Sequence, residues 1–171
     1  MGIVPFHQSA PTRDPFTRPI NRIAVREVDA ETDDAVALID PPAALFFFLG
    51  HPVATGQIDA SWTTEKTFRD DWVYVRTRSG VYRTFFRSIE NLAKQLFEDF
   101  EIAHQGILVN LREVVKVETG RVNRRRAKFV IRSEPSVTEW VTVSRGCWPT
   151  FRRRLGIPDR TPRAPKRPAP A

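Results

Sequence analysis

The stretch FEIAHQGILVN, residues 100–110, and the tripeptide Val-Ser-Arg, residues 143–145, hold the pattern that decides the fold. In the first motif an aromatic residue precedes a histidine, and a polar residue, a small residue, two apolar residues and Val-Asn follow the histidine. A short apolar run between turn-forming residues predicts a buried strand over residues 106–110. The second motif ends another predicted strand and precedes a segment with helical spacing. Two motifs in this order are more specific than either one alone.

Most of the remaining chain has the pattern of short strands. The other predicted strands cover residues 21–28, 35–39, 44–49, 72–78, 81–86, 112–117, 127–132 and 137–143. Ser79-Gly80 separates two of them and predicts a hairpin, and residues 120–126 predict a basic hairpin turn. Because strands and helices do not alternate regularly, the sequence predicts a mainly β domain with antiparallel pairing.

Two short helices are expected. Apolar residues recur at helical spacing over residues 88–97, and Ser88 is the predicted N-cap. A second helix is expected over residues 147–155, with Gly156 as its stop signal. The long polar segment 51–71 has no clear periodicity and is expected to be irregular.

Proline-rich ends bound the predicted domain. Residues 1–20 predict a flexible arm. Residues 156–171 contain five prolines and predict a disordered basic tail. The folded domain is therefore expected to cover residues 21–155.

Positive charge is concentrated in the C-terminal third. The chain has a formal net charge of +7, yet residues 1–99 hold 11 basic and 14 acidic residues. Residues 100–151 hold nine basic and five acidic residues, and the tail from Arg152 holds seven basic residues and one acidic residue. This distribution is expected of a phosphate-facing surface. A solubilising tail on a neutral domain explains the charge equally well.

The composition excludes several classes of protein. No apolar run approaches the roughly 20 residues needed to cross a membrane, and the N-terminus lacks the pattern of a signal peptide. The single Cys147 excludes an internal disulfide and a cysteine-based zinc site, and a reducing cytoplasm is expected. The three histidines lack metal spacing, no catalytic set emerges, and no cofactor is expected. For Cys147 a buried thiol is favoured over a redox role.

The two motifs resemble those of the LytTR domain, a bacterial DNA-binding module, over roughly residues 34–155. The resemblance rests on Phe100, His104, Gln105, Gly106, Ile107, Leu108, Val109 and Asn110, followed by Val143, Ser144 and Arg145. Gln105 stands where the family commonly has a basic residue, and Gly106 stands where it commonly has serine. The resemblance implies an elongated stack of small antiparallel sheets with two short helices. Such a domain inserts loops, rather than a recognition helix, into the grooves of double-stranded DNA.

The resemblance also implies which residues read DNA. Arg145 would lie on a loop in a major groove, where its guanidinium can donate two hydrogen bonds to guanine. A phosphate contact, or a surface arginine at a helix start, is the alternative. Gln105 would donate to an A·T acceptor in the minor groove, or else bind a phosphate or cap a turn. His104 and Asn110 would hold turns by side-chain hydrogen bonds.

A third reading loop would precede the predicted strand at residues 72–78, in a segment that is enlarged in this chain. Its candidate DNA-facing residues are Lys66, Arg69, Asp70, Asp71 and Trp72. An irregular surface loop with an aromatic anchor is the alternative. Phosphate contacts, or a solvated turn, are expected from Arg124, Arg125, Arg126 and Lys128. Packing rather than base stacking is expected of Phe46, Phe47, Phe48, Trp140 and Trp148.

These patterns favour a sequence-specific bacterial DNA-binding transcriptional regulator over an enzyme. By analogy with the family, we expect binding to repeated sites as a homodimer or in tandem, and a separate signalling partner. A LytTR-like protein-interaction module or antagonist is the alternative, and Gln105-Gly106 and Asp70-Asp71 favour it. Nonspecific nucleic-acid binding through the basic tail is a third hypothesis.

Overall fold

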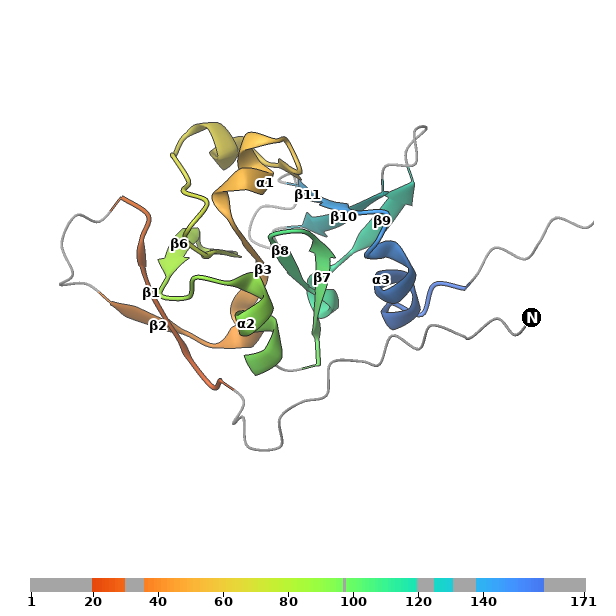
Figure 1. Ribbon diagram of the computed structural model, residues 1–171, viewed down its shortest axis with the longest axis horizontal. Helices are drawn as coiled ribbons and strands as arrows, with labels where there is room; N and C mark the ends of the chain where they lie inside the picture. Colours follow the sequence, from red (N-terminus) through yellow and green to blue (C-terminus); the bar gives the residue numbers. More distant parts are fainter. Residues whose placement is uncertain (1–19, 30–35, 97, 120–124, 131–137, 159–171) are drawn as a thin grey trace, which may run out of the picture.

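The computed structural model describes residues 20–29, 36–96, 98–119, 125–130 and 138–158 (Figure 1). Residues 1–19 of the predicted arm and residues 159–171 of the predicted tail lie outside the described residues, as does Arg124 of the predicted basic turn. The described residues form two antiparallel sheets and short helices.

The larger sheet has seven strands in the order β2-β1-β6-β5-β3-β8-β7. Its strands are β1 (Ile23–Glu27), β2 (Ala37–Ile39), β3 (Ala44–Phe48), β5 (Tyr74–Thr77), β6 (Val81–Thr84), β7 (Phe100–His104) and β8 (Ile107–Asn110). Every pairing is antiparallel. β5 and β6 form the hairpin predicted at Ser79-Gly80, which Thr77 closes by donating its backbone N–H to the oxygen of Gly80 at 2.9 Å. The predicted mainly β, antiparallel fold class is confirmed.

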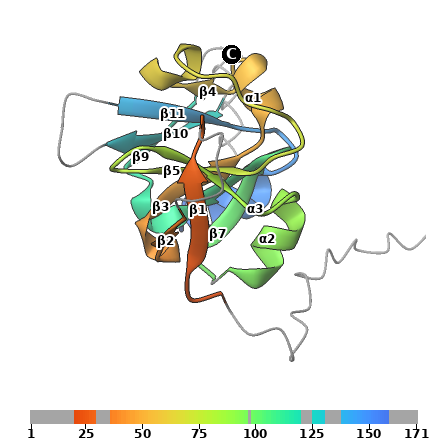
Figure 2. The ribbon, with the colours of Figure 1, turned by 90° about the vertical axis from the view of Figure 1, so that its left-hand side faces the viewer.

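The smaller sheet has four antiparallel strands in the order β4-β11-β10-β9. Its strands are β4 (Ile58–Asp59), β9 (Lys116–Thr119), β10 (Arg125–Val130) and β11 (Thr138–Val143). Figure 1 shows β9, β10 and β11 toward one side of the molecule and β1 and β2 toward the other, and Figure 2 gives the view from the β1 side. Among the described residues, the buried core shared with the smaller sheet includes residues of β3, β5, β7 and β8 but none of β1 or β2. The larger sheet therefore extends beyond the part that the smaller sheet covers.

Strand β3 separates two hydrophobic cores because its side chains alternate between the faces of the sheet. Phe46 and Phe48 belong to the core shared with the smaller sheet, where both rings contact Trp62. Phe47 belongs to the core beneath the helix that follows β6, where it contacts Phe100. All three phenylalanines are fully buried, so their predicted packing role is confirmed. A continuous aromatic run is expected for a strand that is covered on both faces.

Three short α-helices are present in the described part of the chain, where two were predicted. They are α1 (Gly50–Ala54), α2 (Ile89–Gln95) and α3 (Trp148–Arg154). Helix α2 begins as predicted, because the Ser88 hydroxyl accepts a hydrogen bond from the backbone N–H of Asn91 at 3.2 Å. Helix α3 ends at Arg154, and Gly156 stops it as predicted, with a left-handed φ of 71° and its N–H donated to the oxygen of Arg153. No described helix has the length and hydropathy that crossing a membrane requires.

The segment 51–71, in which no helix or strand was predicted, contains short elements. It contains most of helix α1, strand β4 and the 3-10 helix η2 (Ser61–Thr64). These elements have two to five residues each, which is too short to produce a periodicity in the sequence. Tertiary contacts hold the segment instead, because the rings of Trp62 and Phe68 pack against Phe48 at centroid distances of 5.3 Å each.

The predicted strand at residues 112–117 and the predicted basic turn at residues 120–126 both differ from the structure. The predicted strand 112–117 consists of the 3-10 helix η3 (Leu111–Glu113) and then the start of β9. The Asn110 side chain produces this turn, because its oxygen accepts from the N–H of Arg112 at 3.1 Å while its amide donates to the oxygen of Ala44 at 2.9 Å. The structural role predicted for Asn110 is thus confirmed. The second correction concerns Arg125 and Arg126, which begin strand β10 instead of lying in a basic turn.

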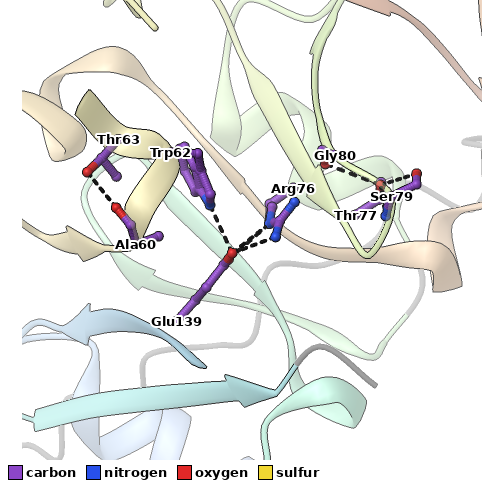
Figure 3. Close-up of polar contacts among 8 residues, drawn as sticks. All are labelled: Ala60, Trp62, Thr63, Arg76, Thr77, Ser79, Gly80 and Glu139. Atoms are coloured by element: carbon purple, nitrogen blue, oxygen red, sulfur yellow. Dashed lines mark hydrogen bonds and ion pairs between the residues drawn. The ribbon is translucent and has the colours of Figure 1, made fainter. Parts of the chain in front are cut away.

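A buried ion pair joins the two sheets (Figure 3). Arg76 of β5 donates from Nε and from its terminal nitrogen to the carboxylate of Glu139 in β11, the shortest distance being 2.6 Å. The indole N–H of Trp62 donates to the same carboxylate at 2.9 Å. The side chains of Arg76 and Glu139 are 10% and 1% exposed. The larger sheet, the smaller sheet and η2 thus share one carboxylate. A further 3-10 helix, η1 (Pro41–Ala43), precedes β3.

Candidate nucleic-acid interface

The turn between β7 and β8 lies against the end of β3. Leu49 donates its backbone N–H to the oxygen of Gly106 at 2.9 Å. Gly106 has a φ of 79°, and a Cβ at this position would lie 3.2 Å from the Cγ of Pro52. The left-handed backbone conformation therefore favours glycine, and the tight approach to Pro52 adds to this preference. Next to it, Gln105 is exposed, so the turn presents the predicted minor-groove residue to solvent.

The loop over residues 65–71 lies against the same end of β3. Gly50 donates its backbone N–H to the oxygen of Arg69 at 3.1 Å. A Cβ at Gly50 would lie 2.5 Å from the backbone oxygen of Phe68, so a larger residue would push this loop away. The Arg69 guanidinium is 67% exposed and donates two hydrogen bonds of 3.0 Å to the carboxylate of Asp71. Arg69 is thus presented at the surface with its charge partly balanced.

The loop after β11 completes the arrangement. Ser144 donates its backbone N–H to the oxygen of Ala103 in β7 at 2.7 Å. The Ser144 hydroxyl accepts from the N–H of Cys147 at 3.2 Å, and the Ser144 oxygen accepts from the N–H of Trp148 at 3.0 Å, which starts helix α3. Arg145 is exposed on the turn between these anchors. Its predicted position on a loop after the last strand is confirmed.

Three loops from distant parts of the sequence therefore meet at one end of the molecule. We call this region the loop end and define it as residues 65–72, 104–106 and 144–147. Each loop is fixed by backbone hydrogen bonds to a neighbouring strand end or loop, so that Gln105, Arg145 and Arg69 project from a common framework. Such a constellation of side chains on rigid supports is suited to recognising a shaped partner.

Arg125 is an additional cation next to the loop end. It lies opposite Val143 in the β10–β11 ladder, and its Cζ lies 4.6 Å from the ring centroid of Trp148. Trp148 packs at the edge of the core and holds the guanidinium near the Arg145 turn. Further along β10, Arg126 and Lys128 lie opposite Thr142 and Trp140. The three predicted phosphate-binding residues that the structure describes are thus not equivalent, since Arg125 is the one that lies opposite Val143, at the start of the Val-Ser-Arg motif.

The other candidate residues differ in how they are held. Lys66 forms an ion pair of 2.8 Å with Asp29, and its side chain is 34% exposed. Asp70 is exposed beside the Arg69–Asp71 pair. His104 has its Nδ1 at 3.0 Å from the oxygen of Gln105, in agreement with the predicted role in holding the turn. Cys147 is a half-buried free thiol.

Trp72 is surrounded by arginines, which the sequence patterns did not predict. The Cζ atoms of Arg87, Arg83 and Arg26 lie 3.5, 4.3 and 5.7 Å from its ring centroid. The rest of this group is Phe85, which is 48% exposed and lies under Arg26 at 4.7 Å. Trp72 is therefore an aromatic anchor for cations. The signal that could have revealed it is the single arginine in each of β1 and β6, but only once the register that places them opposite each other is known.

The described residues contain no group of three or more His, Cys, Asp or Glu side chains arranged to hold a metal ion. The loop end instead offers guanidinium, amide and backbone donors together with the Asp70 and Asp71 carboxylates. Donors of this type bind phosphates and the edges of bases.

Comparison with known proteins identifies the fold. No family model matches the sequence, and no curated protein matches it. A solved structure, the LytTr DNA-binding domain of a Bacillus cereus protein, superposes with a TM-score of 0.56 at 15% sequence identity. The match covers 80% of this chain and 98% of that chain. The chain therefore has a LytTR-type fold, as the two motifs predicted.

Proposed function

We propose that this chain of LytTR-type fold is a sequence-specific regulator of transcription that binds double-stranded DNA through the loop end. The observation that carries the proposal is the convergence of Gln105, Arg145 and the Arg69 loop on one framework of backbone hydrogen bonds. The similar Bacillus cereus structure is named a DNA-binding domain, which supports DNA as the ligand of this chain. In this proposal the domain spans residues 21–155 and acts without enzymatic chemistry.

Each loop has a separate task in this proposal. Arg145, exposed on its turn, donates two hydrogen bonds to the O6 and N7 atoms of a guanine in a major groove. The Gln105 amide donates to an A·T acceptor in the adjoining minor groove. Arg69, once released from Asp71, contacts bases or phosphates beyond the minor groove, and Asp71 accepts from a cytosine amino group.

In this proposal, further basic residues supply sequence-independent attraction. Phosphate contacts are proposed for Lys66, Arg124, Arg125, Arg126 and Lys128. Arg125 is the strongest of these candidates, because Trp148 holds its guanidinium beside the Arg145 turn. Counterions released from phosphates would make the affinity fall steeply with salt.

A protein-interaction module is the second candidate function. It is favoured by the bidentate Arg69–Asp71 pair and by exposed Asp70, because these carboxylates repel phosphates. Binding as a homodimer or in tandem to repeated sites, a separate signalling partner, and a bacterial cytoplasmic location accompany the first candidate as proposals from the family likeness.

Selection of bound duplexes from a random pool tests the proposed function. Sequence-specific binding predicts an enriched motif that binds typically 10³-fold or more tightly than a scrambled duplex at the same salt concentration. A pool that shows no enrichment, with equal affinity for all duplexes, would leave only nonspecific binding. Failure to bind any duplex would favour the protein-interaction module.

A further inference from the structure

The Trp72 cluster, which we define as Arg26, Trp72, Arg83, Phe85 and Arg87, is an unusual grouping of cations on one ring. Arg26 and Arg83 lie directly opposite each other in the β1–β6 ladder. Like charges in this position repel each other. The face of the Trp72 indole stabilises them, since guanidinium groups are attracted to the negative face of an aromatic ring. The ring therefore holds together cations that would otherwise separate.

Part of this cluster lacks partners for its hydrogen-bond donors. The Nε of Arg83 and the Nε1 of Trp72 are buried, and neither has a hydrogen-bond partner in the part of the chain that the structure describes. Arg87 contacts the Asp71 carboxylate at 3.4 Å and is 57% exposed. Asp71 in turn is already engaged by Arg69 in two hydrogen bonds. One shared carboxylate therefore faces Arg69 and Arg87, and Arg83 lies beside them.

The cluster continues the loop end along the edge of the larger sheet. In that sheet the strands β8, β3, β5 and β6 are successive neighbours. Gln105 precedes β8, the Arg69 loop lies at the end of β3, Trp72 precedes β5, and Arg87 follows β6. Three strand spacings separate β8 from β6, a distance of about 14 Å. Because phosphates along one DNA strand advance by about 3.4 Å of helix axis, this distance spans roughly four nucleotides.

We infer that the Trp72 cluster is a phosphate clamp that binds the backbone of double-stranded DNA beside the loop end. This inference rests on the proposed function, because it uses DNA as the ligand of the adjoining loops. Arg87 and Arg83 donate to successive phosphate oxygens, Trp72 fixes the planes of their guanidinium groups, and the phosphates displace Arg87 from Asp71. The clamp strengthens binding to every duplex and carries no base preference, because phosphates are the same in every sequence.

The test uses the full chain and measures duplex affinity as a function of salt concentration. The clamp variant is Arg83→Gln/Arg87→Gln, and it is compared with Arg83→Lys/Arg87→Lys, which keeps both charges. The matched control is Arg112→Gln/Lys116→Gln, which removes two exposed cations away from the loop end. Circular dichroism is recorded for every variant, and the lysine variant keeps the test valid if glutamine at Arg83 perturbs the fold.

If the clamp exists, the slope of log affinity against log salt concentration should be flatter in the glutamine variant, by about 0.9 for each phosphate that it no longer neutralises. The change should be equal on selected and random duplexes. The lysine variant should keep most of the slope, and the control should keep all of it. An unchanged slope in the glutamine variant, with specific binding intact, would overturn the clamp and leave the proposed function standing. If the chain binds all duplexes equally and the slope is flatter in the glutamine variant, the clamp is supported and sequence-specific binding is overturned. Absence of binding to any duplex would overturn both, and binding of an acidic polypeptide that needs Arg83 and Arg87 would then identify a protein partner.

Discussion

Gly106 shows how one residue fixes the position of a candidate reading side chain. Its φ of 79° is strained for a residue with a side chain, and a Cβ at this position would make a tight contact of 3.2 Å with Pro52. We predict that Gly106→Ala destabilises the domain by more than about 1 kcal/mol, because the left-handed conformation and the close approach act together. Gly146→Ala is the matched control, since a Cβ at Gly146 meets nothing within 4 Å. Urea denaturation measures both, and equal stability of the two variants would contradict this account of the turn.

Arg145 carries the largest share of the proposed base recognition. We predict that Arg145→Ala weakens binding to the selected duplex by about 1–3 kcal/mol, because the variant cannot form the two hydrogen bonds to a guanine. The domain should remain folded, since the side chain is exposed. Competition binding on selected and mutated duplexes measures the effect, with Arg112→Ala as a control whose side chain is 75% exposed in η3, away from the loop end. Equal weakening on both duplexes would make Arg145 a phosphate contact.

At the scale of the elements, the buried pair of Arg76 and Glu139 links β5 to β11. We predict that Glu139→Leu destabilises the domain by about 3–5 kcal/mol, because it leaves the Arg76 guanidinium buried without its carboxylate. The double variant Arg76→Met/Glu139→Leu should be less destabilised than the single variant, since no charge then stays buried. Chemical denaturation compares them. A double variant as unstable as the single one would show that side-chain shape, not charge, is decisive.

Elements with strong local signals could be predicted from the sequence. Helix α2 has apolar residues at helical spacing and a capping serine, and the β5–β6 hairpin has Ser79-Gly80 between alternating runs. Helix α1 and strand β4 could not be predicted in this way. They are too short to show a period, and Trp62 and Phe68 hold their segment through contacts with distant strands. Strand β7 was not predicted, although it lies within the motif that contains His104.

The candidate site could be predicted only in part, because some of its residues are brought together by pairing between distant strands. The resemblance to the LytTR motifs implied exposed positions for Gln105 and Arg145, and both lie on turns next to strands with clear apolar runs. The Trp72 cluster depends on the register of β1 against β6, which places Arg26 opposite Arg83. A one-residue shift in that register would put these side chains on the other face of the sheet. Pairing between strands so far apart along the chain leaves no local trace in the sequence.

At the scale of the whole molecule, the basic C-terminal residues add charge outside the described fold. We predict that deletion of residues 159–171 lowers the affinity for all duplexes nearly uniformly and leaves stability unchanged. The deletion removes Arg160, Arg163, Lys166 and Arg167 but keeps the Gly156 cap of α3. Each phosphate that the tail no longer neutralises should flatten the log–log salt dependence by about 0.9. A full-length chain with glutamine at the four basic positions is the control for length, and an unchanged slope in both would show that the tail does not bind DNA.

In the proposed function, one end of the molecule, built from three loops, binds DNA. Titration of the isotope-labelled chain with the selected duplex, followed by backbone amide chemical shifts, shows which residues the duplex contacts. Binding through the loop end predicts the largest shift changes at residues 65–72, 104–106 and 144–147, and small changes at the opposite end, in the Ser79-Gly80 turn and η3. Large changes confined to that opposite end, with the three loops unaffected, would contradict it.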